Sequence, residues 1–210
     1  MKLALFGATG ATGRCLVEQA LAQGHEVTAF TRNPAALTLR HERLVVVQGD
    51  VLDAGQVQVA VAGKEAVLCA LGTSSRAHTT VLSEGTKNII AAMEKDGVRR
   101  LVCESSFGVG ESRGQGGLVL RYVIIPFFLN HVYADKEIQE QFIQRSNLDW
   151  VIVRPTRLTN GPRTGAYRAG VNLKMPLAPW CTVSRADVAD FMLKQLTDDT
   201  YLRQAPAINN

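Results

Sequence analysis

The stretch Gly7-Ala8-Thr9-Gly10-Ala11-Thr12-Gly13 decides the fold of this chain. It follows a short apolar run, residues 3–6, that predicts a buried strand, and it precedes an amphipathic run, residues 15–21, that predicts a helix. Glycines allow the backbone to turn tightly, and the first turn of a helix presents unpaired N–H groups and the positive end of its dipole. Strand, turn and helix together therefore predict a cradle for the pyrophosphate of a dinucleotide.

Strand and helix candidates alternate along the rest of the chain. Further strands are expected at residues 26–31, 44–48, 66–71, 100–104 and 150–153, and helices at residues 53–62, 79–95, 134–145 and 185–196. Ser184 followed by Asp187 has the spacing of a helix cap before the last of these helices. The alternation predicts an α/β fold, a Rossmann-type, doubly wound parallel sheet with helices on both faces.

The whole chain, residues 1–210, is expected to form this single domain. Its length suits one substantial α/β unit, and no repeat or low-complexity linker divides it. The substrate-side loops are expected at about residues 107–132 and 157–183.

Charge and cysteine content exclude several classes of protein. The net charge is +4, but the positive residues are scattered without a basic run, so we expect no nucleic-acid partner. Cys15, Cys69, Cys103 and Cys181 have no metal-ligand spacing, so they predict buried thiols in a reducing compartment and no metal site.

We also expect no signal peptide, no membrane span and a cytoplasmic location. The apolar residues 118–129 fall short of the roughly 20 needed to cross a bilayer.

The end of the second strand discriminates between dinucleotides. An NAD-selective site has an acidic residue there for the ribose 2′-hydroxyl, whereas this chain has Thr31-Arg32-Asn33. A guanidinium pairs well with a 2′-phosphate, so the sequence favours NADPH as the cofactor. The simpler alternative is that Arg32 is a solvated loop charge.

Ligands of such a sheet bind beyond the carboxyl ends of its strands. The candidate cofactor-binding residues at those ends are Gly7, Thr9, Gly10, Ala11, Thr12, Gly13, Arg32, Asn33, Asp50, Val51, Leu71, Gly72, Thr73, Ser105, Arg154, Pro155 and Thr156. Asp50 is placed to accept a hydrogen bond from an adenine amino group, or else it is a turn carboxylate. Pro155 would shape a wall near the nicotinamide.

Several short motifs occur in a recognisable order. They are Gly-Ala-Thr-Gly-x-Thr-Gly at 7–13, Thr-Arg at 31–32, Gly-Asp-Val-Leu at 49–52, Leu-Gly-Thr at 71–73, Ser-Glu-Gly-x-x-Asn-Ile at 83–89, a serine at 105 and Thr-Gly-Ala-Tyr at 164–167. This set resembles the atypical short-chain dehydrogenase/reductase (SDR) family, and within it the flavin and biliverdin-IXβ reductases. The resemblance implies an NADPH-dependent, often monomeric enzyme that reduces flavins, biliverdins or related planar acceptors. It also implies that Ser105 lies next to the nicotinamide.

The chain departs from that family around the expected substrate pocket. After Phe107 it has a glycine-rich segment, residues 108–117, that predicts a flexible loop where the family has bulky apolar residues. Arg157 stands where the family has a pocket histidine. The identity of the substrate therefore does not transfer, and Phe107, Arg157, Arg163 and Tyr167 are the candidate substrate-binding residues.

The acid pair of ordinary SDR enzymes is altered here. Those enzymes place a lysine four residues after a tyrosine on one helix, and the lysine lowers the pKa of the tyrosine. This chain has Tyr133 and Lys136, three residues apart, which still share a helix side, although Tyr133 is expected at or before the helix start. We retain Ser105, Tyr133 and Lys136 as catalytic candidates. Without a working pair, the chemistry is confined to acceptors that need little acid help, such as a flavin or the conjugated bridge of a linear tetrapyrrole.

The sequence thus predicts an NADPH-dependent reductase of a small planar conjugated substrate, as a monomer or weak homodimer. A non-catalytic NADP(H)-binding redox sensor is an alternative that the altered acid pair supports. A sugar-nucleotide epimerase or reductase is a weaker one, because only about 54 residues follow Thr156 and those enzymes need a C-terminal substrate domain. The apolar residues 118–129 predict a buried helix, or else a substrate wall or dimer face.

Overall fold

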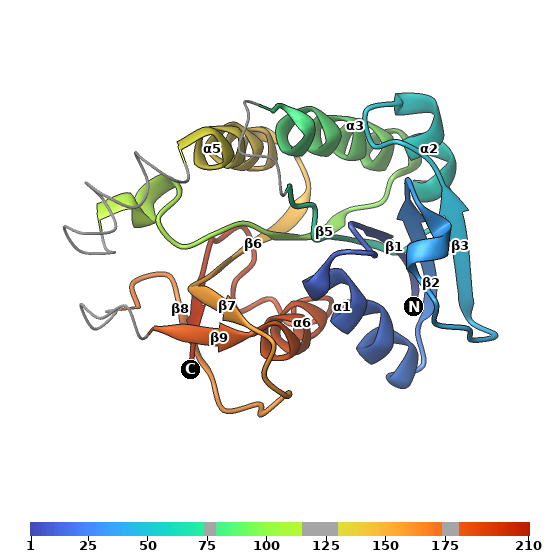
Figure 1. Cartoon of the computed structure of the whole chain (residues 1–210). Helices are drawn as coiled ribbons and strands as arrows, with labels where there is room; N and C mark the ends of the chain where they lie inside the picture. The colour runs from blue at the N-terminus through green and yellow to red at the C-terminus, as the bar shows by residue number, and fades with distance from the viewer. Residues whose placement is uncertain (74–78, 115–129, 174–180) are drawn as a thin grey trace.

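The computed structural model describes residues 1–73, 79–114, 130–173 and 181–210 of the chain. In these residues a central sheet has the strand order β3-β2-β1-β4-β5-β6-β10-β8 (Figure 1). Its strands are β1 (Lys2–Phe6), β2 (Glu26–Thr31), β3 (Leu44–Gln48), β4 (Ala66–Cys69), β5 (Arg100–Glu104), β6 (Asp149–Pro155), β8 (Arg168–Gly170) and β10 (Ala207–Asn209). Neighbouring strands are parallel except for the β10–β8 pair at one edge.

The strand order reverses between β1 and β4. From β1 the chain proceeds outward through β2 to β3, and it then returns to the other side of β1 and continues through β4, β5 and β6. Ligands of open parallel sheets bind at such a switch point, outside the carboxyl ends of the strands.

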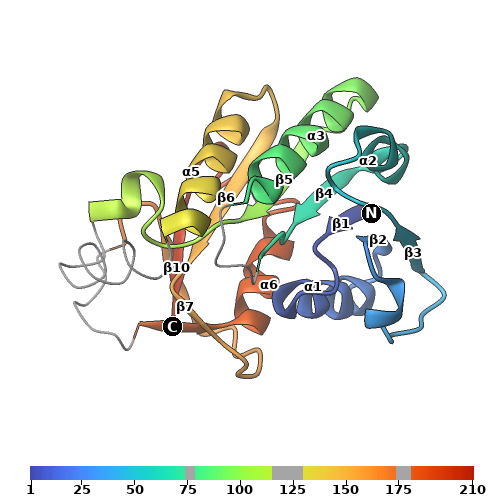
Figure 2. The same cartoon turned by 45° about the horizontal axis from the view of Figure 1, so that its top comes forward.

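Helices cover both faces of the sheet, as Figures 1 and 2 show from two directions. The helices are α1 (Ala11–Ala22), α2 (Ala54–Val61), α3 (Val81–Asp96), α5 (Asn130–Arg145) and α6 (Arg185–Lys194). On one face α1 packs against α6, and on the other face α3 packs between α2 and α5. Short 3-10 turns, η1 (Pro34–Ala36) and η2 (Gly110–Gly114), and a two-stranded sheet of β7 (Arg157–Thr159) and β9 (Thr182–Ser184) complete the described elements.

Each face of the sheet has its own apolar core. Successive residues of a strand point to opposite faces, so Leu3 and Leu5 belong to the core under α1 and α6. Ala4 and Phe6 belong to the core under α2, α3 and α5. Burial on both faces explains why the strands are nearly continuous apolar runs.

The predicted α/β fold is confirmed, and so are most of its elements. Strands β2, β3 and β5 have the predicted bounds. The cap of the last helix is also present, because the Ser184 side chain accepts a hydrogen bond of 2.9 Å from the backbone N–H of Asp187.

The structure adds detail to the expected elements at two places. Helix α5 begins at Asn130 rather than at residue 134, so Tyr133 lies inside the helix and not at or before its start. Residues 110–114 of the expected flexible loop form the turn η2. The apolar residues 118–129 lie outside the described part of the chain. No helix of the described ranges is long and apolar enough to cross a membrane.

Candidate active site

The turn after β1 has the geometry of a phosphate cradle. Gly7 has a φ of +82°, and a Cβ on it would lie 2.2 Å from the carbonyl oxygen of Ala70. A Cβ on Gly13 would lie 2.1 Å from the carbonyl oxygen of Gly7, so both positions require glycine. Helix α1 begins after Gly10 without a side-chain cap, which leaves its first N–H groups available to an anion. These residues fit a pyrophosphate.

A cavity of about 660 Å³ opens at the carboxyl ends of the strands, a volume that suits a small-molecule ligand. It is lined by most of the predicted residues: Gly7, Thr9, Gly10, Ala11, Thr12, Arg32, Asn33, Val51, Leu71, Gly72, Thr73, Ser105 and Lys136. Gly13 lies behind the turn and supports it by close packing. The fold thus brings the phosphate turn and the end of β5 to one cavity.

The sequence missed several residues of the cavity wall: Phe30, Gly49, Ala70, Val81, Glu104, Val132, Leu158 and Arg185. Phe30, Gly49, Ala70 and Glu104 directly precede strand-end residues that the sequence singled out, so the strand-end rule applied one residue more widely would have found these four. Val132, Leu158 and Arg185 come from α5, β7 and α6, and no local pattern marks these three.

Arg32 lies at one end of the cavity. It directly follows β2, and its side chain is exposed. Among the described residues its guanidinium has no hydrogen bond or ion pair, although the Arg32 carbonyl oxygen accepts from the Gln48 amide at 3.4 Å. Thr31 stabilises the backbone on either side of Arg32, because its hydroxyl lies 3.4 Å from the Thr9 hydroxyl and accepts from the Asn33 N–H at 3.2 Å. Arg32 is therefore free to meet an anionic group in the cavity.

Asp50 is not among the residues that line the cavity, and its predicted contact with adenine gains no support from this geometry. Its Oδ1 accepts from the Leu52 N–H at 3.0 Å, and its own N–H donates to the Gln56 side chain at 2.9 Å. The turn-carboxylate alternative describes Asp50 correctly. The neighbouring Val51 lines the cavity instead.

Arg154, Pro155 and Thr156, which were also predicted to bind the cofactor, are not among the described residues that line the cavity. The sequence did not reveal β10, which pairs with the end of β6 and accepts a 3.0 Å hydrogen bond from the Thr156 hydroxyl at Asn209. The Arg154 guanidinium is buried and pairs with Glu140 of α5 at 2.5 Å and with Glu111 of η2 at 2.6 Å. The hydrogen bond from Arg154 lowers the pKa of Glu111. Arg154 therefore ties three elements together.

None of the four predicted substrate residues lines the cavity, and only Arg163 and Tyr167 share a partner. The Phe107 side chain is buried, and Arg157 is exposed at the start of β7. Arg163 lies 3.5 Å from Asp190 on α6, and the Tyr167 hydroxyl donates to the same carboxylate at 2.7 Å. Burial raises the pKa of Tyr167 to about 12. Arg163 and Tyr167 thus hold the loop before β8 against α6.

The structure separates Tyr133 from Lys136. The Tyr133 hydroxyl donates to the carbonyl oxygen of Phe107 at 3.0 Å, and burial raises its pKa to about 12. Tyr133 does not line the cavity, whereas the buried Lys136 does, with its Nζ 3.3 Å from the carbonyl oxygen of Glu104. The two residues share a helix but do not form an acid pair at the cavity.

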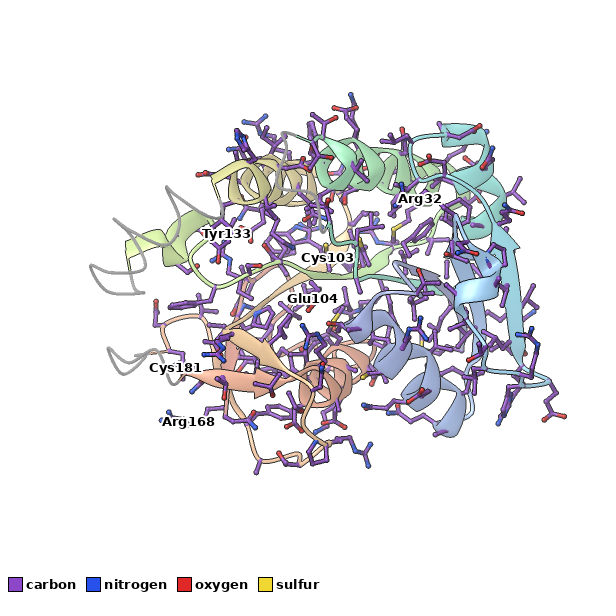
Figure 3. The ribbon with its side chains drawn as sticks, viewed as in Figure 1. Arg32, Cys103, Glu104, Tyr133, Arg168 and Cys181 are labelled. Atoms are coloured by element: carbon purple, nitrogen blue, oxygen red, sulfur yellow. The ribbon has the colours of Figure 1, made fainter. Side chains whose placement is uncertain are left out.

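Glu104 and Ser105 line the cavity at the end of β5. The Ser105 hydroxyl is buried and has no hydrogen-bond partner in the described structure, which is costly unless a ligand supplies one. Glu104 is the last residue of β5 (Figure 3), and its Oε1 accepts from the Thr12 hydroxyl at 3.0 Å. Burial raises the pKa of Glu104, against the opposing influence of Lys136, of the Thr12 hydrogen bond and of Arg185.

Comparison with known proteins places this geometry in a family. Residues 7–199 match a family described as NAD(P)H-binding. Among solved structures, ChuY of Escherichia coli O157:H7, described as an anaerobillin reductase, is 25% identical over 99% of this chain and 96% of its own, with a TM-score of 0.82. A short-chain dehydrogenase/reductase of Veillonella parvula in complex with NADP shares the fold, with 20% identity over 100% of this chain and 94% of its own and a TM-score of 0.80.

Curated relatives agree over part of their length. A chloroplastic protein of Arabidopsis thaliana is 33% identical over 174 residues, which cover 78% of this chain and 61% of that protein. A 3-beta-hydroxysteroid dehydrogenase of Mycolicibacterium neoaurum is 30% identical over 162 residues, which cover 70% of this chain and 43% of that enzyme. The chain therefore spans about three fifths or less of these relatives. Because the family match covers most of the chain and its fold and phosphate turn agree with it, the protein belongs to the NAD(P)H-binding Rossmann proteins of the atypical SDR family.

Proposed function

We propose that this protein is an NADPH-dependent reductase that transfers hydride to a flavin-like or other planar conjugated acceptor. One observation carries the proposal: a single cavity extends from the phosphate turn and Arg32 to Ser105 and Lys136. The bound dinucleotide supplies the hydride. The residues of the chain bind it, orient it and shape the space for the acceptor.

Different lining residues bind different parts of the dinucleotide and the acceptor. The turn from Gly7 to Gly13 and the start of α1 hold the pyrophosphate, and the exposed Arg32 pairs with a 2′-phosphate. The unpartnered Ser105 hydroxyl is positioned for the nicotinamide or the acceptor. The similarity to ChuY, described as an anaerobillin reductase, supports a planar acceptor.

The position of Tyr133 favours such acceptors over simple ketones. Reduction of a ketone produces a localised alkoxide, for which ordinary SDR enzymes use their tyrosine as the acid. Here the tyrosine hydroxyl donates to the Phe107 carbonyl outside the cavity. Hydride addition to a flavin or a tetrapyrrole bridge produces a delocalised anion, which is less basic and does not need that tyrosine.

The test is consumption of NADPH by the purified protein with FMN as the acceptor, with NADH in parallel. We expect turnover that is selective for NADPH. If NADPH binds tightly and neither FMN nor a linear tetrapyrrole is reduced, the reductase proposal is wrong. The displaced Tyr133 then favours the second candidate, a non-catalytic NADP(H) sensor.

A further inference from the structure

We propose that Glu104 is the proton donor of the reaction and delivers a proton from Oε2 to the acceptor. This inference rests on the proposed reductase function. The sequence prediction did not include Glu104 in the site, but the fold places its side chain in the wall of the cavity beside Ser105.

The backbone of Glu104 is fixed by the sheet, and its carboxyl group is bonded to α1. Glu104 is the last residue of β5, which pairs in register with β4 and β6. Its Oε1 accepts from the Thr12 hydroxyl, which lies in the first turn of α1. With Oε1 occupied as an acceptor, Oε2 is the oxygen that carries the proton, because a neutral carboxyl group has one O–H donor. Thr12 thereby orients the donor.

Glu104 is also the one carboxylic acid among the described residues that line the cavity. Tyr133 donates to Phe107 outside the cavity, and Asp50 is engaged in its own turn. A carboxyl group is a far stronger acid than a phenol, and so it suits the weakly basic, delocalised anion that a planar conjugated acceptor forms.

The charged, polar and titratable groups that face Glu104 come from three elements. Lys136 of α5 donates to the backbone carbonyl of Glu104, Arg185 of α6 lines the same cavity, and Thr12 and Cys15 face it from α1. The two cations and the hydroxyl favour the carboxylate, but burial outweighs them, and the pKa of Glu104 is raised. A pyrophosphate at the start of α1 adds negative charge nearby and raises this pKa further.

The proton step balances without another reactant. The acceptor gains a hydride, and its delocalised anion takes the proton as the O–H bond of Glu104 breaks and an N–H or C–H bond of the product forms. The resulting carboxylate recovers its proton from water that enters the open cavity. Acceptor reduction thus consumes one hydride and one proton.

Glu104→Gln tests the step while it retains a side-chain oxygen for Thr12. For the wild type, kcat with NADPH and FMN falls as pH rises through the pKa of Glu104, because the proton donor is lost. We expect the variant to lose about 100-fold in kcat, within the usual range for a general acid, and to lose that dependence on pH. Glu104→Asp should keep the pH dependence at reduced kcat. NADPH binding, measured by fluorescence, and the melting temperature establish that each variant is folded.

A second readout does not depend on turnover. Infrared difference spectra, wild type minus Glu104→Gln, follow the band of the protonated carboxyl group as pH is raised. We expect the band to persist above the ordinary pKa of a glutamic acid, and further still when NADPH is bound, because its phosphates add negative charge that disfavours the carboxylate. If the band disappears at the ordinary pKa of a glutamic acid, both with and without bound dinucleotide, the inference is wrong.

The outcomes separate the two proposals. If the wild type reduces no planar acceptor, the proposed function fails and Glu104 has no such role. If the wild type reduces FMN and Glu104→Gln stays within about twofold of its kcat with the same pH profile, only the proton-donor inference fails.

Discussion

At the scale of single residues, partners decide what each side chain can do. Tyr133 and Lys136 are three positions apart on α5, yet the tyrosine donates to Phe107 while the lysine reaches the cavity. Glu104 and Ser105 are neighbours in sequence, and both meet the cavity at the end of β5. Arg32 stands at the opposite end, exposed and available to an anion.

Arg32→Ala should weaken NADPH binding by about 10- to 100-fold, the effect of losing one or two charge-assisted hydrogen bonds. NADH lacks the 2′-phosphate, so its affinity should change by less than about twofold. Titration of both dinucleotides by fluorescence measures the two ratios. An equal loss for both would show that Arg32 does not read the 2′-phosphate.

Tyr133→Phe should leave kcat within about twofold of the wild type, because the hydroxyl lies outside the cavity. The lost hydrogen bond to Phe107 should lower the free energy of unfolding by about 1 kcal/mol. Steady-state kinetics and chemical denaturation check the two values. A hundredfold loss of kcat in a folded variant would show that Tyr133 acts as the general acid.

At the scale of elements, one buried arginine joins β6, α5 and η2. Arg154 of β6 bonds to Glu140 of α5 through two hydrogen bonds, of 3.1 and 2.5 Å, and to Glu111 of η2. The side chains of Arg154 and Glu140 are 4% and 3% exposed, whereas that of Glu111 is 71% exposed. The two carboxylates should therefore differ greatly in how much each contributes to the free energy of unfolding.

Glu140→Gln should destabilise the protein by about 3 kcal/mol, because it removes the buried counter-charge of Arg154. Glu111→Gln is the matched control, and its effect should stay below about 1 kcal/mol, since an exposed ion pair is screened by water. Chemical denaturation of the two variants measures the difference. Equal effects would show that burial does not set the strength of these pairs.

At the scale of the whole molecule, the sheet order creates the site. Strands β1 and β4 are neighbours with β2 and β5 on their outer sides, so the carboxyl ends of four strands meet around one opening. Helices α1 and α5 lie on opposite faces of the sheet (Figures 1 and 2). The amino end of α1 and Lys136 of α5 both line the opening. Neither face alone would enclose a dinucleotide and an acceptor.

The amino-acid sequence by itself determined the features that depend on local chemistry. The glycine turn follows from close backbone approach at Gly7 and Gly13, the strands from their apolar runs, and the start of α6 from Ser184 and Asp187. These local rules also placed Arg32 and Ser105 at strand ends, and both line the cavity.

Only the tertiary structure decided which strand-end residues meet the cavity. Strand β10 has three residues and acquires its place by pairing with β6, so no local pattern reveals that it encloses Thr156. Thr12 and Glu104 form their hydrogen bond across 92 positions of sequence, and its geometry exists only once α1 packs on the sheet. A side chain's partner, burial and pKa are set by such long-range contacts, and therefore the role of Glu104 emerges only in the folded chain.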